Sequence, residues 1–250
     1  MLSADSTFNE EIYFFDTFGY CLIKNFLDKI EIKNIAKTLD LIEQNNYTLN
    51  GTDVCLGQIN EHGTVFISNI ASATPLLTLK AFDPRVLNLL EIFMNGKFKL
   101  NHSNAIIARE GSTYPHMAGY PIHNMAFYHT SGQAILSSLT KLVVPISNNT
   151  ADSGGFAIVK GSHKASFAIP YASRSSQEHE LLEFVKLDPG DALLFTEAMT
   201  HGSLTNKSGK KRKMIFYCYS LDYMPQWPTQ NVHISDRFKQ SLPESLHKYV

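Results

Sequence analysis

The chain has 250 residues, of which 44% are hydrophobic and 18% charged, a globular balance that excludes intrinsic disorder and suits one large domain or two small ones. Its formal net charge of −1 gives no general attraction to nucleic acid or to an anionic membrane. Because no apolar run is long enough to span a bilayer and no signal peptide is indicated, we expect a cytoplasmic protein without a membrane or nucleic-acid partner.

The first third of the chain predicts helices around one short strand. Residues 8–18 are typical of an amphipathic helix that ends at Gly19, and residues 20–26 are typical of a strand. Asp28 can cap the next helix, which extends to about Glu43 with apolar residues at helical spacing. The Asp-Pro pair before residue 85 indicates one more helix, over residues 85–94.

The remainder of the chain predicts strands, because apolar or alternating runs follow one another and are mostly bounded by Gly, Pro, Asn or Asp. These runs cover residues 98–108, 134–146, 155–159, 192–196 and 213–220. Several strands at short spacing without intervening helices favour an antiparallel sandwich or barrel over a βαβ fold. The predicted architecture is therefore mainly β, with helices contributed by the N-terminal third.

Ten histidines invite a search for a metal site, although most histidines in a globular chain are surface or core residues. His123 directly precedes a strand pattern, and His201 follows the buried strand that begins after the turn at residues 189–191. Arg212 starts the next strand, eleven residues after His201. Histidines on opposite strands of a jelly roll can converge in one barrel mouth, where a buried arginine needs an anion such as a dicarboxylate. The alternative is an arginine on a solvated hairpin among its lysine neighbours.

Four motifs carry a resemblance to a known family. They are the segment DSGGFAIVKGSHK at residues 152–164, Pro-Gly-Asp at 189–191, His-Gly-Ser at 201–203, and the downstream Asn206 with Arg212. In this order they resemble the phytanoyl-CoA dioxygenase family of Fe(II)/2-oxoglutarate oxygenases, and the opening FFDTFGYCLIKNFLDKIEI resembles the usual start of that family. The resemblance implies a double-stranded β-helix (jelly roll, cupin-like) with an N-terminal helical layer, forming a single domain over residues 1–250.

The resemblance also implies roles for individual residues. His123 and His201 would be the two imidazole ligands of Fe(II), Arg212 would pair with the far carboxylate of 2-oxoglutarate, and Ser203 would hydrogen-bond the same end. With O₂ as the second cosubstrate, the protein would oxidise a C–H bond of a small molecule, by hydroxylation, while 2-oxoglutarate becomes succinate and CO₂. His163, in the glycine-rich segment, is expected to be structural and not a ligand.

One position departs from the family pattern. The metal motif of the family is His-x-Asp, and this chain has Met125 at the carboxylate position. A thioether is neutral and soft, so it is a poor substitute for a carboxylate on Fe(II). In a first interpretation another carboxylate completes the site, and Glu197, four residues before His201, is the nearest in sequence. A hydrogen-bonding role for Glu197 at the strand end is the simpler alternative.

Two further interpretations remain open. Two histidines and 2-oxoglutarate could hold the iron, with water or halide in place of the carboxylate, an arrangement similar to that of some halogenases with the oxygenase fold. Those halogenases have Gly or Ala at this position, and the bulkier Met125 would fill the space for the halide, which disfavours halogenation. Alternatively, iron binding is lost and the barrel is a non-catalytic ligand-binding protein. We favour an oxygenase, with the binding protein as the alternative. No motif indicates the substrate or the oligomeric state.

Overall fold

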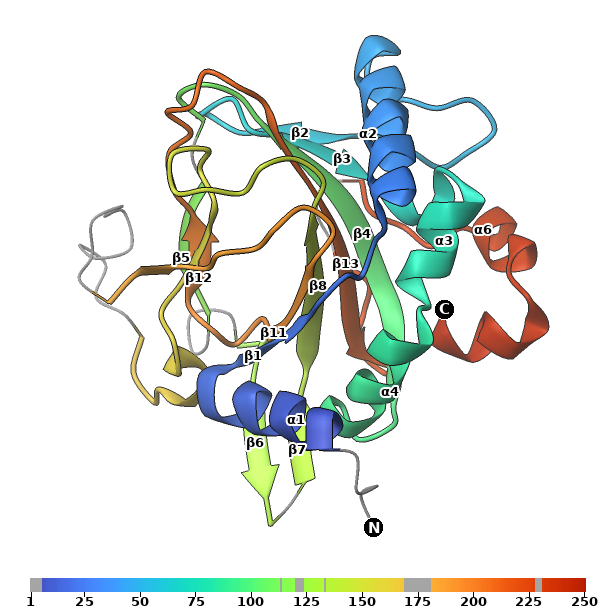
Figure 1. Ribbon diagram of the computed structural model, residues 1–250. Helices are drawn as coiled ribbons and strands as arrows, with labels where there is room; N and C mark the ends of the chain where they lie inside the picture. Colours follow the sequence, from blue (N-terminus) through green and yellow to red (C-terminus); the bar gives the residue numbers. More distant parts are fainter. Residues whose placement is uncertain (1–5, 113, 120–123, 133, 169–180, 228–230) are drawn as a thin grey trace.

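The computed structural model describes residues 6–112, 114–119, 124–132, 134–168, 181–227 and 231–250. Within these residues, antiparallel strands form two sheets that face each other across a barrel (Figure 1). The larger sheet contains, in spatial order, β1 (Tyr20–Ile23), β11 (Ala192–Thr196), β8 (Leu139–Pro145), β13 (Arg212–Leu221), β4 (Phe98–Ala108), β3 (Val65–Ser68) and β2 (Cys55–Ile59). The smaller sheet contains β10 (Glu183–Phe184), β9 (Phe156–Ile158), β12 (His201–Ser203) and β5 (Tyr114–Ala118). This double sheet is a jelly roll, which confirms the predicted fold class.

The two N-terminal helices follow the predicted capping signals. Helix α1 (Ser6–Phe18) ends at Gly19, which has a φ of +86° and donates its N–H to the Phe15 carbonyl at 2.9 Å. Helix α2 (Lys29–Gln44) begins after Asp28, whose carboxylate accepts the N–H groups of Ile30 and Glu31 in a capping box. The helix predicted over residues 85–94 is α4 (Pro84–Phe93).

Helices α2, α3 (Pro75–Ala81) and α4 lie on the outer side of the larger sheet (Figure 1). The hydroxyl groups of Tyr217 and Tyr219 on β13 donate to the carbonyls of Leu77 and Ala81 of α3, at 2.8 and 2.7 Å. Successive residues of a strand face opposite sides. Residues 216 and 218 of β13 therefore face the space between the two sheets, where the candidate site lies.

The structure differs from the prediction in two places. The predicted strand 20–26 ends at Ile23, because Asn25 has a φ of +51° and its N–H donates to Asp191. The predicted strand 134–146 is divided at Ser138, whose N–H donates to the Phe127 carbonyl. Its first half, β7 (Ala134–Ser137), forms a separate hairpin with β6 (Tyr128–Ser131), and its second half is β8.

Some elements were not predicted from the sequence. They include strands β2, β3, β5, β10 and β12, the 3-10 helices η1 (Ile70–Ser72), η2 (Ser162–Lys164) and η3 (Glu244–Tyr249), and helices α3 and α6 (Asp236–Ser241). In the described part of the chain, no helix combines the length and the apolar character needed to cross a membrane.

His163 has a structural position, as predicted. Its side chain is buried, its Nε2–H donates to the Asp16 carbonyl of α1 at 3.0 Å, and its ring packs edge-on against Tyr128 of β6 with 4.5 Å between centroids. A Cβ added at Gly19 would lie 2.8 Å from its Nδ1. His163 therefore joins α1, the β6–β7 hairpin and the glycine-rich segment.

The burial of His163 predicts a loss of stability in acid. Burial lowers its pKa to about 4, so the unfolded chain takes up a proton near pH 6.5 that the folded protein does not accept until about pH 4. Stability is therefore lost as the pH falls through this window. We expect His163→Gln to reduce the loss between pH 7 and pH 5 by about 2 kcal/mol in urea unfolding. The same pH dependence in both proteins would contradict this.

Candidate active site

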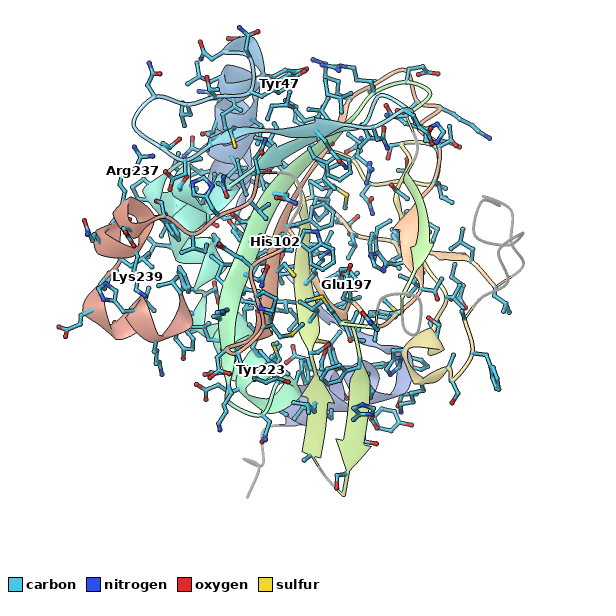
Figure 2. The ribbon with its side chains drawn as sticks, turned by 180° about the vertical axis from the view of Figure 1, so that it is seen from behind. Tyr47, His102, Glu197, Tyr223, Arg237 and Lys239 are labelled. Atoms are coloured by element: carbon cyan, nitrogen blue, oxygen red, sulfur yellow. The ribbon has the colours of Figure 1, made fainter. Side chains whose placement is uncertain are left out.

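A row of residues crosses the inner face of the larger sheet. The register places His102 of β4 opposite Cys218 of β13, Cys218 opposite Lys141 of β8, and Lys141 opposite Phe195 of β11. Residues paired in this way project from the same face of a sheet. Figure 2 shows His102 and Glu197 between the two sheets. The row thus places polar groups inside the barrel.

His201 enters the same space from the smaller sheet, as the first residue of β12. It is buried, and its ring lies 4.9 Å from the Phe195 ring and 5.8 Å from the Phe156 ring, measured between centroids. Its Nδ1 lies 2.8 Å from the Met199 carbonyl oxygen, which can only accept, so Nδ1 donates and Nε2 carries the lone pair. This is the usual arrangement of a metal-binding imidazole.

Glu197 lies beside His201. Its side chain is 4% exposed, and its Oε1 is 3.8 Å from His201 Nε2. The same oxygen accepts a hydrogen bond from Lys141 Nζ at 3.0 Å. The Glu197 N–H donates to the Leu139 carbonyl at 2.9 Å, which continues the β11–β8 ladder past the end of β11. The structure therefore brings Glu197 and His201 together, and adds Lys141, which the sequence did not single out.

His123 lies outside the described residues, but the chain on both sides of it is described. Ala118 pairs with His201 in the smaller sheet, and a Cβ added at Gly119 would lie 2.6 Å from the Ala198 carbonyl oxygen. On the other side, the Met125 carbonyl accepts a hydrogen bond from Ser138 Oγ at 2.6 Å. Among the described residues, no three His, Cys, Asp or Glu side chains form a metal-binding group by themselves.

Arg212 is a buried cation at the start of β13. Within the described residues, its guanidinium Nη1 lies 2.6 Å from Met214 Sδ, its Nε has no hydrogen-bond partner, and it forms no ion pair with a carboxylate. Burial lowers its pKa to about 10, so it remains charged at neutral pH. An arginine in this state fits an anionic ligand. The alternative interpretation, a solvated arginine on a hairpin, is thus wrong.

The two remaining motif residues hold different positions. Ser203 is the last residue of β12, where it pairs with Phe156 of β9. Asn206 is fully buried, and its Nδ2 donates to the carbonyls of Ala108 and Lys210 at 3.1 and 2.7 Å. Because Ala108 is the residue paired with Arg212, Asn206 ties the β12–β13 turn to the strand next to Arg212.

His102 is a buried residue of the barrel interior that no sequence motif indicated. Its Nδ1 lies 3.0 Å from Asn101 Oδ1. Burial and the nearby charge of Lys141 lower its pKa to about 3, so it is neutral at physiological pH. Alternation along the predicted strand 98–108 could have placed it on one face with residues 104 and 106. Which face was internal was not evident from the sequence.

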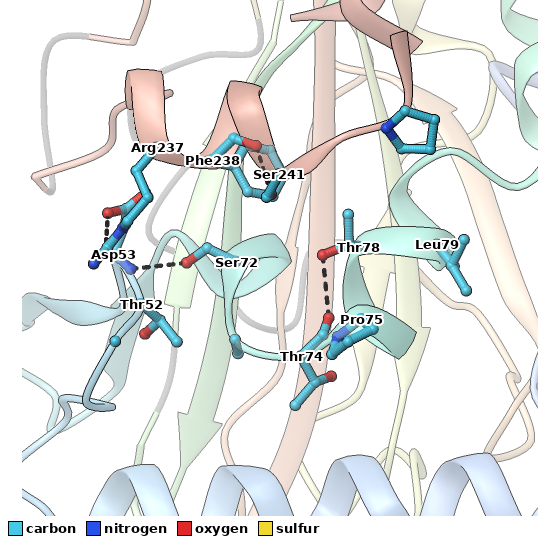
Figure 3. Close-up of a pocket in the computed structure, with 13 residues that line it drawn as sticks. Thr52, Asp53, Ser72, Thr74, Pro75, Thr78, Leu79, Arg237, Phe238 and Ser241 are labelled. Atoms are coloured by element: carbon cyan, nitrogen blue, oxygen red, sulfur yellow. Dashed lines mark hydrogen bonds and ion pairs between the residues drawn. The ribbon is translucent and has the colours of Figure 1, made fainter. Parts of the chain in front are cut away.

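A separate cavity lies outside the barrel and contains none of the candidate residues. It has a volume of about 470 Å³ and lies between α3, α6 and the loop before β2 (Figure 3). An ion pair between Arg237 and Asp53, with several hydroxyl side chains, lines it. The chemistry expected from the sequence is therefore not located in this cavity.

Comparison with known proteins gives a family for most of the chain. The model of the family described as phytanoyl-CoA dioxygenase matches residues 15–214. A curated relative, dioxygenase lolE1 from Epichloe uncinata, is 34% identical over 85 residues, which cover 33% of this chain and 33% of the relative. The matched segment thus spans about a third of that protein's length.

Solved structures share the fold. HygX from Streptomyces hygroscopicus, determined with nickel and 2-oxoglutarate bound, has a TM-score of 0.75 at 19% identity, covering 91% of this chain and 90% of that chain. The α-ketoglutarate-dependent epimerase SnoN from nogalamycin biosynthesis has a TM-score of 0.62 at 15% identity, covering 93% of this chain and 97% of that chain. At this level of identity the likeness establishes the jelly-roll fold.

Proposed function

The chain belongs to the phytanoyl-CoA dioxygenase family, and we propose that it is an Fe(II)/2-oxoglutarate-dependent oxygenase that hydroxylates a small molecule. The structural neighbour HygX was crystallised with hygromycin B, an example of a small-molecule ligand on this fold. No motif identifies the small molecule that this chain would bind or the loops that would bind it.

The observation that supports the proposal most strongly is the state of Arg212. A buried guanidinium without a carboxylate near it is costly unless an anion binds there. A dicarboxylate such as 2-oxoglutarate offers one carboxylate for the planar, two-pronged guanidinium and another for a metal. The inward-facing sulfur of Met214 provides no charge to offset that of Arg212.

His201 fits the role of a metal ligand, because its Nδ1–H is held by the Met199 carbonyl and its Nε2 faces Glu197. His123 would be the second imidazole ligand, and Ser203 would bind the same end of 2-oxoglutarate as Arg212. When bound, Fe(II) supplies the activation of O₂ that protein side chains cannot perform. The chain itself would bind and orient the cosubstrate and keep the site dry with the rings of Phe156 and Phe195.

The proposal is tested by adding Fe(II) and 2-oxoglutarate to the purified protein without oxygen. We expect the weak visible charge-transfer band of a metal–2-oxoglutarate complex, and conversion of 2-oxoglutarate to succinate when O₂ is admitted. Binding of 2-oxoglutarate without metal, band or succinate would instead support the non-catalytic binding protein. The neutral Met125 at the family's carboxylate position is the feature that keeps this alternative open.

A further inference from the structure

We infer that Glu197 is the carboxylate ligand of the metal site, in place of the missing acidic residue at position 125, and that Lys141 holds it in position. This inference rests on the proposed function, because it concerns the metal that His201 would bind. It moves the third protein ligand from the turn at position 125 to the turn before His201.

The separation of the donor atoms supports a shared metal. Glu197 Oε1 and His201 Nε2 are 3.8 Å apart, which is too long for a hydrogen bond. Two metal–ligand bonds of about 2.1 Å place their donor atoms roughly 3.0 Å apart at a right angle and roughly 4.2 Å apart in line. The observed distance lies between these limits, so a small rotation of the Glu197 side chain would bring both donors to the spacing of neighbouring ligands on one metal ion.

Both donors come from one short, well-connected turn. The Met199 N–H donates to the Thr196 carbonyl at 3.0 Å, and the Ala198 N–H donates to Thr196 Oγ1 at 3.3 Å. Thr196 Oγ1 in turn accepts from Ser137 Oγ at 2.8 Å. With the Glu197 backbone paired to β8 on one side and His201 paired in the smaller sheet on the other, the turn presents a carboxylate and an imidazole at a set spacing.

The buried charges need an explanation that simple packing does not give. Glu197 is 4% exposed and Lys141 is 20% exposed, on the inner face of the barrel. Removing two ions from water costs more than an apolar pair of the same size, so an ion pair here is weak support for a purely stabilising role. The ion pair lies next to His201, whose imidazole is oriented as in a metal ligand, and this position indicates a role in metal binding. A carboxylate oxygen can accept from Lys141 and still offer a lone pair to a metal.

Met125 does not supply the missing ligand charge. Its thioether is neutral, its side chain is half-buried, and it packs against the large hydrophobic cluster of the fold. Sulfur ligands of this kind suit soft metals and not Fe(II), whereas a carboxylate suits it. Among the described residues, Glu197 is the acidic side chain that forms a close pair with His201.

The test is metal binding and not activity. Anaerobic calorimetry with Fe(II), together with the visible spectrum of the Co(II) form, should be recorded for the full chain and for Glu197→Gln. We expect Glu197→Gln to weaken Fe(II) binding at least about tenfold and to change the Co(II) spectrum, because one ligand is lost. Glu183→Gln is the matched control, since Glu183 pairs with Lys160 at the same 3.0 Å but on the surface, and it should bind as the wild type.

A second pair of variants separates ligation from folding and from charge. Lys141→Met retains the carboxylate and removes only the hydrogen bond that orients it, so it should lose less Fe(II) affinity than Glu197→Gln. The double variant Glu197→Gln with Lys141→Met removes both charges of this ion pair. It should therefore fold, which circular dichroism verifies, and still bind Fe(II) weakly. Wild-type affinity in the folded double variant, or equal losses in Lys141→Met and Glu197→Gln, would overturn the inference. A wild-type protein that binds no metal would instead overturn the proposed function.

Discussion

Replacement of Arg212 by alanine is expected to weaken 2-oxoglutarate binding by about 2–4 kcal/mol, or roughly 30- to 1,000-fold in Kd. The guanidinium is buried at the start of β13, and within the described residues no carboxylate neutralises it. A carboxylate of the bound dicarboxylate would therefore lose its water and accept two charge-assisted hydrogen bonds from the guanidinium. Alanine cannot donate these hydrogen bonds. Arg212→Lys should recover little of the affinity, because an ammonium group lacks the planar fork.

The experiment is a titration of 2-oxoglutarate into the Fe(II)-loaded protein without oxygen. Arg237→Ala is a suitable control, because Arg237 is an ion-paired arginine beside the separate outer cavity (Figure 3). It should leave the affinity unchanged. If Arg212→Ala binds 2-oxoglutarate as tightly as the wild type, Arg212 is not its anchor. Lys213 cannot replace it, because Lys213 faces the other side of the sheet and pairs with Asp40 of α2.

Replacement of His201 by alanine should have the largest effect on the metal, a loss of more than about 100-fold in Fe(II) affinity. We infer this magnitude because the loss of a residue that only orients a metal ligand already lowers metal affinity 10- to 100-fold. His201 would provide the ligand itself, and its ring is held in place by the Met199 carbonyl and by Phe195. The substitution removes the donor together with this preorganisation.

Calorimetry with Fe(II) under anaerobic conditions measures this effect, and the same measurement on His123→Ala tests whether the two histidines share one metal. His62→Ala is the control, because His62 lies on the surface next to Glu61. Retained affinity in both His201→Ala and His123→Ala would place the metal elsewhere. A loss in His201→Ala alone would leave His201 as a ligand and remove His123 from the site.

Local sequence signals predicted the elements that depend on neighbouring residues. The Asp28 capping box, the turn at Gly19 and the alternating run of β4 each involve residues a few positions apart, and each is present in the structure. The order of the four motifs was sufficient to predict the jelly roll, because in the resembled family these motifs occur in the same order along a jelly-roll domain. It also predicted that Arg212 would be internal, which its burial confirms.

Contacts between distant segments were decided by the tertiary structure. Lys141 and Glu197 are 56 residues apart in the chain, and they meet because β8 and β11 are neighbours in the larger sheet. His102 faces the same space because β4 pairs with β13, which pairs with β8. No local pattern encodes such register, since the energy that selects it comes from burying whole sheet faces at once. The sequence by itself therefore determined the fold and two candidate anchors, His201 and Arg212. The juxtaposition of Glu197 with Lys141 and His201 required the assembled barrel.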